Sequence, residues 1–354
     1  MRGRRAASAV ALTAVALIAV VASTRALGST STTSSTTSST SSTTASVVTT
    51  TTVPPERPQP GWTVASRSAR GVMVDYTSIT VGGVTFRAVR LRARSTFLRW
   101  HVGTTDPTLA PRVPVDAGPS IDWPVEGPAG IVAVFNGGFK QAAHSGGSMA
   151  DGMVLVPPTP GYMTLALDAQ GHWAMGRWGS PNFPPAGFRP ISWRQNLGPL
   201  VWNGRPTAAA LGANWRAWGD TLGGVPAVAR SALGVDRQGN LVYVATMTPI
   251  LPGPLAIALA RAGAWMGMEL DINPYWPILG APLSPDAPLH GAGALPVQVP
   301  GQEHIPTIYF TGWERDFFVA LAEPGAWGCN WTAPGLGVGN RARPQPLHLT
   351  GACG

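Results

Sequence analysis

The sequence predicts a single α+β domain built on a mixed, mostly antiparallel sheet with few helices. Two observations support this class. Gly 43 and Pro 35 among 354 residues indicate many turns and few long helices. Short apolar runs bounded by turn residues recur along the chain, whereas helical spacing is clear in one segment. With 44% hydrophobic residues, the chain can also form a sizeable core.

The first predicted strands lie between residues 79 and 178. Residues 79–91 have apolar residues at alternate positions around a Gly-Gly turn, which predicts a hairpin, and residues 95–103 follow as another strand. Residues 130–139 form an apolar run that two glycines stop, typical of a strand buried on both faces. Residues 152–178 predict short antiparallel strands with a turn between them.

The second half continues the pattern around one helix. Residues 229–247 predict a hairpin with Asp and Asn in its turn, and residues 252–264 show helical spacing with a glycine at the end. Residues 266–273 predict a strand that ends before a proline. Residues 305–313 and 316–324 are expected to close the domain as strands.

The N-terminus predicts export. Residues 1–26 combine three early arginines with an apolar run and small residues, as in a signal peptide or an uncleaved membrane anchor. Residues 27–61 are rich in Ser, Thr and Pro and are expected to form a disordered linker. We therefore expect the domain, residues 62–327, to be secreted or on the cell surface, with contact to a membrane only through an uncleaved N-terminal segment.

The two cysteines agree with an extracytoplasmic location. Cys329 and Cys353 lie in the Gly/Pro-rich tail, residues 328–354, and are expected to form a disulfide. No His or Cys cluster accompanies them in the sequence, which argues against a metal site there. The formal net charge of +8 includes several arginines near the N-terminus and is too mild to suggest a nucleic-acid partner.

The strongest candidate for a catalytic site is the polar alternation Glu269, Asp271 and Asn273. In a regular strand these three side chains would line one face, because residues two apart point the same way. Two carboxylates that close resist ionising together, which raises the pKa of one of them. One can then act as an acid and the other as a base. Their oxygens would also suit calcium, and the sequence indicates no other cofactor. The alternative is an exposed strand face with solvated acids.

Two further segments contain candidate substrate-binding residues. Asn136, Gly137 and Gly138 end a buried strand, and such a turn lets the backbone approach a ligand and offer amide donors. Arg230 opens an otherwise apolar strand, where its guanidinium would suit a phosphate. The alternatives are a plain turn for the former and a structural ion pair for the latter. No serine-hydrolase elbow, P-loop, zinc-protease or dinucleotide motif occurs.

The order of these segments resembles the phosphodiester glycosidase family over residues 84–321. Asn136 to Phe139 match its Asn-Gly-Gly-Phe-like motif, and Arg230, Ser231 and the three residues that follow match its Arg-Thr/Ser-Ala-Ile/Leu-Gly motif. Asp271 matches the Asp of an Asn-Leu-Asp motif, but Glu269 replaces the Asn. Residues 272–275 replace the glycine and serine loop that follows Asp271 in the family.

The resemblance implies an extracellular hydrolase of a glycosyl phosphodiester or a related cell-envelope glycan. Asp271 and Glu269 would then be catalytic, and Arg230, Ser231 and Asn273 would bind a carbohydrate or sugar-phosphate substrate together with the Asn-Gly-Gly turn. Trp218 and Trp276 are candidates for stacking on sugar rings. The alternative is a non-catalytic glycan-binding or wall-associated protein that keeps the same fold.

Overall fold

The computed structural model describes residues 61–107, 117–282 and 295–325. All of them belong to one unit, Val53–Gly354. The predicted signal peptide or anchor, the linker up to residue 60, and the tail with Cys329 and Cys353 lie outside the described residues. No helix within the described ranges is long and apolar enough to cross a membrane.

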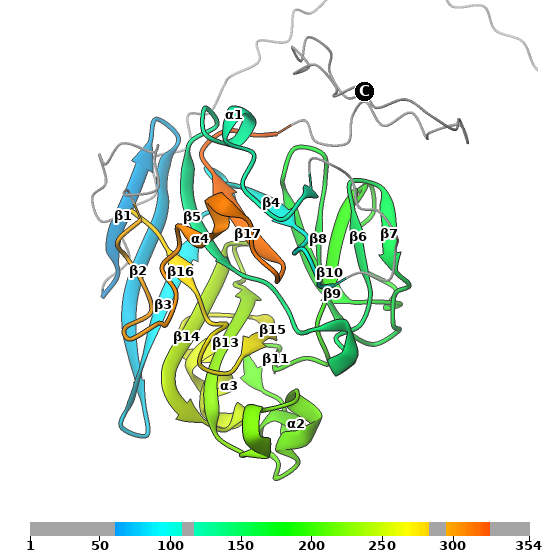
Figure 1. Ribbon diagram of the computed structural model, residues 1–354, viewed down its shortest axis with the longest axis vertical. Coiled ribbons are helices and arrows are strands. Elements are labelled where there is room, and N and C mark those ends of the chain that lie inside the picture. The colour runs from blue at the N-terminus through cyan, green and yellow to red at the C-terminus, as the bar shows by residue number, and fades with distance from the viewer. Residues whose placement is uncertain (1–60, 108–116, 283–294, 326–354) are drawn as a thin grey trace, which may run out of the picture. The chain divides into compact units, whose positions relative to one another are not determined.

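The described strands form three sheets (Figure 1). The largest has the strand order β1-β2-β3-β14-β13-β15-β11-β12, with the bounds Thr63–Ser68, Gly71–Val81, Val84–Leu91, Leu241–Ile250, Val228–Val235, Met266–Ile272, Val201–Trp202 and Arg205–Pro206. The second has the order β7-β6-β10-β8-β9, with the bounds Met153–Val156, Ser148–Ala150, Ser192–Gln195, Met163–Leu167 and Trp173–Arg177. The third has the order β16-β5-β17-β4, with the bounds Leu279–Gly280, Ile131–Asn136, Phe317–Leu321 and Phe97–His101.

Every pairing between described strands is antiparallel. The predicted α+β class with few helices is confirmed, while the strands divide among three sheets where the sequence predicts one. In the β2–β3 hairpin, Gly82 and Gly83 have φ of 55° and 81°, which suits a tight turn. In the β13–β14 turn, Asp236 Oδ1 accepts from the N–H groups of Gln238 and Asn240.

Helices are few and mostly short. The elements are α1 Trp123–Glu126, η2 Gln141–Ala143, α2 Ala208–Leu211, η3 Trp215–Trp218, η4 Leu222–Gly224, α3 Pro252–Arg261 and α4 Ile308–Thr311. Helix α3 confirms the helical spacing, because Leu255 and Leu259 are both buried. The strand predicted over residues 305–313 is wrong: a proline starts a helical turn there, and Gly312 at φ 105° ends it.

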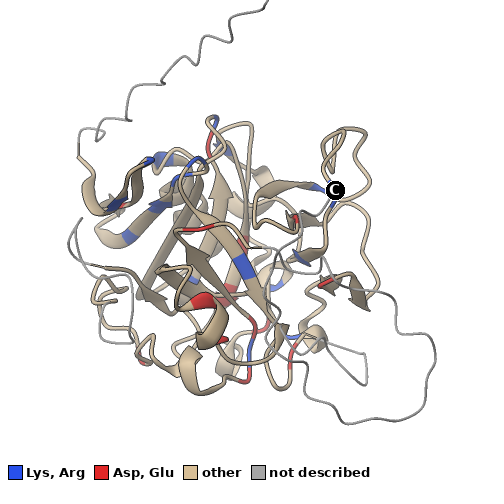
Figure 2. Ribbon diagram, turned by 90° about the horizontal axis from the view of Figure 1, so that it is seen from above, with Lys and Arg blue, Asp and Glu red and all other residues tan. Residues whose placement is uncertain are grey.

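Buried side chains of the large sheet belong to two core clusters, one on each face. Leu233 and Met268 pack in one cluster, and Ala232 packs in the other with α3. This alternation along β13 is expected of a strand covered on both faces. Figure 2 shows that charged residues of both signs are scattered over the ribbon. Several arginines and acids are nevertheless buried, among them Arg194, Arg230 and Asp316. Buried charges require partners.

Candidate functional site

The acidic segment of β15 does not present its carboxylates on one face. The pairing of β13 with β15 shifts register, so that Arg230 lies opposite Ile272 whereas Ala232 lies opposite Glu269. Ile272 consequently packs in the same core cluster as Ala232, while Leu270 packs in the other cluster. The predicted shared face is wrong because a β-bulge inserts one residue and breaks the alternation. The bulge places the side chains of Glu269 and Ile272 on the same face of the sheet, and Asp271 does not share that face.

Glu269 and Arg230 form an ion pair in the core. Arg230 Nη1 lies 2.6 Å from Glu269 Oε1, and both side chains are fully buried. The same arginine donates from Nε to the carbonyl of Ile250 and from Nη1 to that of Trp218. Burial raises the pKa of Glu269 to about 7, against the lowering effect of Arg230. The contacts of Arg230 are those of the structural ion pair that the sequence left open as an alternative.

The pKa of Glu269 predicts a pH dependence of stability. The folded chain holds a proton that an unfolded chain with the ordinary pKa of 4.5 releases. The stabilising contribution is therefore full below pH 4.5, decreases as the pH rises, and is lost above about 7. We expect Glu269→Gln to flatten the fall in unfolding free energy between pH 5 and pH 7, measured by urea denaturation. Parallel pH profiles for the variant and the unmodified protein would contradict this assignment.

Asp271 lies beside the Asn-Gly-Gly turn and is held by a second arginine. Its backbone N–H donates to the carbonyl of Gly137 at 2.9 Å, and its Oδ2 accepts from Arg315 Nη2 at 2.6 Å. Oδ1 accepts from the N–H of Ile272. Burial raises the pKa of Asp271 to about 7; Arg315 lowers it and Asp316 raises it further. Such a carboxyl can take up or release a proton near neutral pH.

Asn136 and Ser231 are hydrogen-bonded to each other inside the domain. Asn136 Nδ2 donates to Ser231 Oγ at 2.9 Å, and Ser231 Oγ donates to the carbonyl of Asp271 at 2.7 Å. Asn136 Oδ1 accepts from the hydroxyl of Tyr243 and the N–H of Ile278. These bonds tie the end of β5 to β13, β14 and β15. The two residues therefore position the backbone around Asp271.

A buried ion pair that no sequence motif indicates, Arg194 with Asp316, supports the glycine turn. Asp316 Oδ2 accepts from Arg194 Nε at 2.9 Å, from Trp100 Nε1 at 3.0 Å and from the N–H of Gly138 at 3.2 Å. Arg194 also donates to the carbonyl of Phe139. Both charged side chains are fully buried. The sequence offered no clear signal for this pair, because Arg194 lies in the polar strand Ser192–Gln195 and Asp316 directly precedes β17.

Gly137 is required by this close contact. A Cβ on residue 137 would lie 2.1 Å from Asp316 Oδ2 and 2.7 Å from the Asp316 carbonyl oxygen. We expect Gly137→Ala to lower the free energy of unfolding by about 1–3 kcal/mol, as overpacking does, measured by urea denaturation. Gly198→Ala is the matched control, because nothing lies within 4 Å of its Cβ position. Equal stability of the two variants would show that the turn has room to relax.

Arg315 connects Asp271 to an aromatic patch. Arg315 Cζ lies 5.1 Å from the ring centroid of Trp276, and Lys140 Nζ lies 6.0 Å from the same centroid. Arg315 Nε and Nη1 are buried and have no hydrogen-bond partner among the described residues, Nη1 lying 3.9 Å from Asp106 Oδ2. Unpaired buried donors of this kind suit an anion or ordered water.

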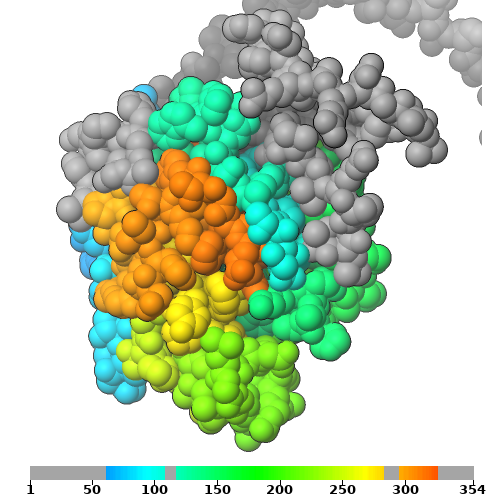
Figure 3. Space-filling view, in the orientation of Figure 1, coloured from blue at the N-terminus to red at the C-terminus, as the bar shows by residue number. Residues whose placement is uncertain are grey.

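Trp276 belongs to a cluster with Tyr275, His304 and Trp313, whose rings contact one another. In Figure 3 the yellow segment around residue 275 and the orange segment from 300 to 320 adjoin on one face. Trp276 is half-buried, and its role in stacking on a sugar stays a prediction. Trp218 is 4% exposed and packs in the core, so it does not offer a ring to a sugar.

Asn273 holds a loop. Its Oδ1 accepts from the N–H of Leu222 at 2.8 Å, and its Nδ2 donates to the carbonyl of Asp220 at 3.2 Å. The oxygens that would suit calcium therefore do not converge, because Glu269, Asp271 and Asn273 each engage different donors. Within the described ranges, no group of three or more His, Cys, Asp or Glu residues could hold a metal ion.

Comparisons with known proteins give a distant likeness of fold. No protein-family model matches the chain, and no curated protein matches it. The auto-inhibited catalytic domain of zebrafish N-acetylglucosamine-1-phosphodiester alpha-N-acetylglucosaminidase is 13% identical with a TM-score of 0.43, over 74% of this chain and 87% of that one.

Two other solved structures give similar values. A hypothetical protein from Synechocystis is 13% identical with a TM-score of 0.42, over 72% of this chain and 63% of that one. A protein from Burkholderia pseudomallei described as exported is 11% identical with a TM-score of 0.36, over 71% and 75%. These values support no inference about activity.

Proposed function

We propose that this protein is an extracellular hydrolase of a glycosyl phosphodiester or a related cell-envelope glycan. The observation that carries the proposal is Asp271, a buried carboxyl with a pKa of about 7 that accepts from Arg315 and whose backbone N–H donates to the carbonyl of Gly137. A proton-transfer group of matched pKa next to a cation is the minimum equipment for such a hydrolysis. The order of the sequence motifs supports the substrate class, and the export segment predicted at residues 1–26 supports the location.

In this proposal Asp271 is the general base. Its carboxylate takes a proton from a water molecule, whose oxygen forms a bond to the anomeric carbon while the bond from that carbon to the phosphate oxygen breaks. A phosphate monoester leaves readily as an anion, so the departing oxygen needs charge stabilisation more than a proton. Arg315 supplies that charge through Nε and Nη1, which donate no hydrogen bond to a described residue.

The other predicted site residues take positioning roles. Glu269 neutralises Arg230, and this pair fixes β15 against β13. Asn136 and Ser231 set the backbone of Asp271 through their hydrogen bonds. Gly137 accepts from the N–H of Asp271 and brings the turn against it.

The test is hydrolysis of a chromogenic or UDP-linked sugar phosphodiester by the purified protein. We expect release of free sugar and a phosphate monoester, with a rate that rises as the pH increases through about 7, because the base is the ionised carboxylate. Absence of turnover across a panel of sugar phosphodiesters between pH 5 and 9 would reject the proposal.

A second candidate is a non-catalytic glycan-binding protein. The aromatic cluster around Trp276 favours it, because half-buried indole rings can stack on sugars without any chemistry. The replacement of the family's glycine and serine loop by residues 272–275 points the same way. Saturable binding of a glycan with no turnover, and no effect of pH near 7, would select this candidate.

A further inference from the structure

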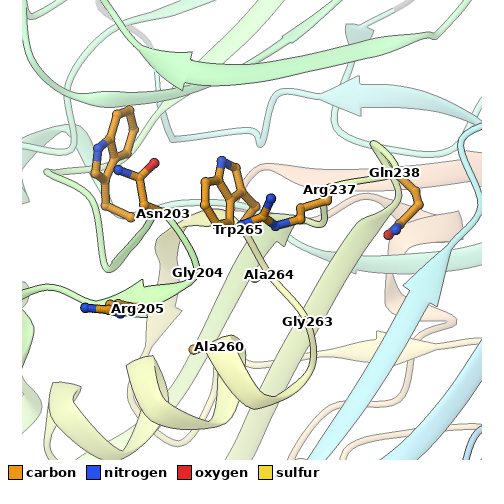
Figure 4. A pocket seen from close by; sticks show the side chains of 10 residues that line it. Asn203, Gly204, Arg205, Arg237, Gln238, Ala260, Gly263, Ala264 and Trp265 are labelled. Atoms are coloured by element: carbon orange, nitrogen blue, oxygen red, sulfur yellow. The ribbon is translucent and has the colours of Figure 1, made fainter.

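A large groove lies at the other end of β15 from Asp271. It has a volume of about 830 Å³ and lies between the β11–β12 turn, the β13–β14 turn and the C-terminal end of α3 (Figure 4). Its polar and aromatic lining consists of Trp202, Asn203, Arg205, Arg237, Gln238 and Trp265. Trp265 directly precedes β15, whereas Asp271 lies near the opposite end of that strand.

The indole of Trp265 is held in place from two directions. The guanidinium carbon of Arg237 lies 3.7 Å from its ring centroid, a contact visible in Figure 4. A Cβ on Gly204 would lie 3.1 Å from the same ring, so the bare glycine backbone packs against it. The backbone of Trp265 is also fixed: its carbonyl accepts from the N–H of Gly204, and its backbone N–H donates to the carbonyl of Val235. The ring is thus a fixed surface on the groove wall.

The β13–β14 turn that carries Arg237 is itself ordered. Asp236 accepts from the N–H groups of Gln238 and Asn240 and from the Asn240 side chain, so its carboxylate is turned inward. Trp173 Nε1 donates to the carbonyl of Gly239 at 2.8 Å. A ligand in the groove would therefore meet side chains that are already positioned, which reduces the entropy cost of binding.

The charged residues that line the groove are all basic. None of its ten lining residues is acidic. The guanidinium groups of Arg205 and Arg237 form no ion pair or hydrogen bond with a described residue, whereas those of the buried Arg194, Arg230 and Arg315 are each paired with a carboxylate. A third guanidinium, that of Arg177, lies 6.0 Å from the ring of Trp202. Cations without internal partners in a concave site favour an anionic ligand.

The remaining lining narrows the ligand class. Asn203 and Gln238 lie on either side of Trp265 in Figure 4, and amide side chains both donate to and accept from hydroxyl groups. The half-buried indole of Trp202 presents a flat apolar surface to the face of a sugar ring. Hydroxyls, apolar ring faces and a negative charge occur together in an acidic oligosaccharide, such as a chain of uronic acid units.

We propose that this groove binds an acidic polysaccharide independently of the Asp271 site. The indole of Trp202 takes a sugar face, and Arg205 together with Arg237, which Trp265 holds in place, takes the carboxylates. The site would hold the protein on an anionic glycan of the cell envelope whether or not Asp271 performs hydrolysis.

The test uses the full-length protein and polygalacturonate as the probe, with neutral dextran as the comparison polymer. We expect saturable binding of polygalacturonate that weakens with added salt, measured by isothermal titration calorimetry. Replacing both groove arginines, Arg205→Gln with Arg237→Gln, should weaken binding at least about tenfold, because two charge-assisted contacts are lost. Both positions are exposed, so these variants should fold normally.

Arg216→Gln is the matched control, because Arg216 also stacks on a tryptophan, Trp215, at 4.3 Å but does not line the groove. Equal weakening by this control, or equal binding of dextran, would overturn the proposal. Tighter binding of a single-stranded oligonucleotide than of polygalacturonate would overturn the ligand class. The groove variant should still hydrolyse a small sugar phosphodiester at the unmodified rate, which separates this result from failure of the proposed function.

Discussion

Replacing Asp271 with Asn is expected to lower kcat/KM for a sugar phosphodiester by about 10²–10⁴-fold, the usual contribution of a general base. The amide keeps the shape of the carboxyl but cannot accept the proton from water. The pH dependence near 7 should disappear with the activity, because the pKa of Asp271 is raised by burial to about 7. Steady-state kinetics from pH 5 to pH 9 measures both effects.

The control separates chemistry from folding. Asp271→Asn also weakens the contact with Arg315, so the melting temperature and far-ultraviolet circular dichroism of each variant must accompany the kinetics. Glu323→Gln removes a surface carboxylate instead and should leave kcat/KM unchanged, because its side chain is 58% exposed and pairs with Arg70. A folded Asp271→Asn variant with full activity would exclude Asp271 as the base.

Asp316→Asn is expected to cause the largest loss of stability, about 3–5 kcal/mol of unfolding free energy. The substitution leaves the charge of Arg194 fully buried without its carboxylate. It also weakens acceptance from Trp100 and from the N–H of Gly138. Calorimetry should show a fall of roughly 10 °C in Tm.

The exposed ion pair of Arg70 and Glu323 calibrates this prediction. Its two side chains are 45% and 58% exposed, so solvent screens the attraction, and Glu323→Gln should cost at most about 1 kcal/mol. A similar small cost for Asp316→Asn would mean that Arg194 finds other acceptors within the core. Its existing bonds to the carbonyls of Phe139 and Gln195 are the first candidates.

Much of the fold could be predicted because local patterns and tertiary structure agree. The hairpin around Gly82 and Gly83 and the helix over Leu255 and Leu259 formed as expected, since turn chemistry and apolar periodicity pointed to the same structure. The division into three sheets could not be predicted, because alternation along a strand says nothing about which strands pair. The strand predicted over residues 305–313 is wrong because residues with high β propensity occupy a helical turn between Pro306 and Gly312.

The structure brings some of the predicted site residues together and separates others. Asp271 and Gly137 do meet, as the sequence suggested, but Arg230 binds Glu269 and not an open ligand site. Arg315 and Asp316, which hold Asp271 and the glycine turn, lie about 45 residues further along and join no recognisable motif. Which buried charges form ion pairs depends on the register between strands. That register cannot be inferred from the spacing of residues within one segment.

Because of the bulge in β15, inserting or deleting a residue in this part of the chain should disturb the structure more than replacing one apolar residue with another. Removing one residue between Glu269 and Asn273 would restore a regular ladder and rotate every later side chain by half a turn. Arg315 would then lose Asp271, and the loop anchored by Asn273 would lose its hold on Leu222. Relatives that share this architecture should therefore tolerate exchanges among apolar residues here but accept neither insertions nor deletions.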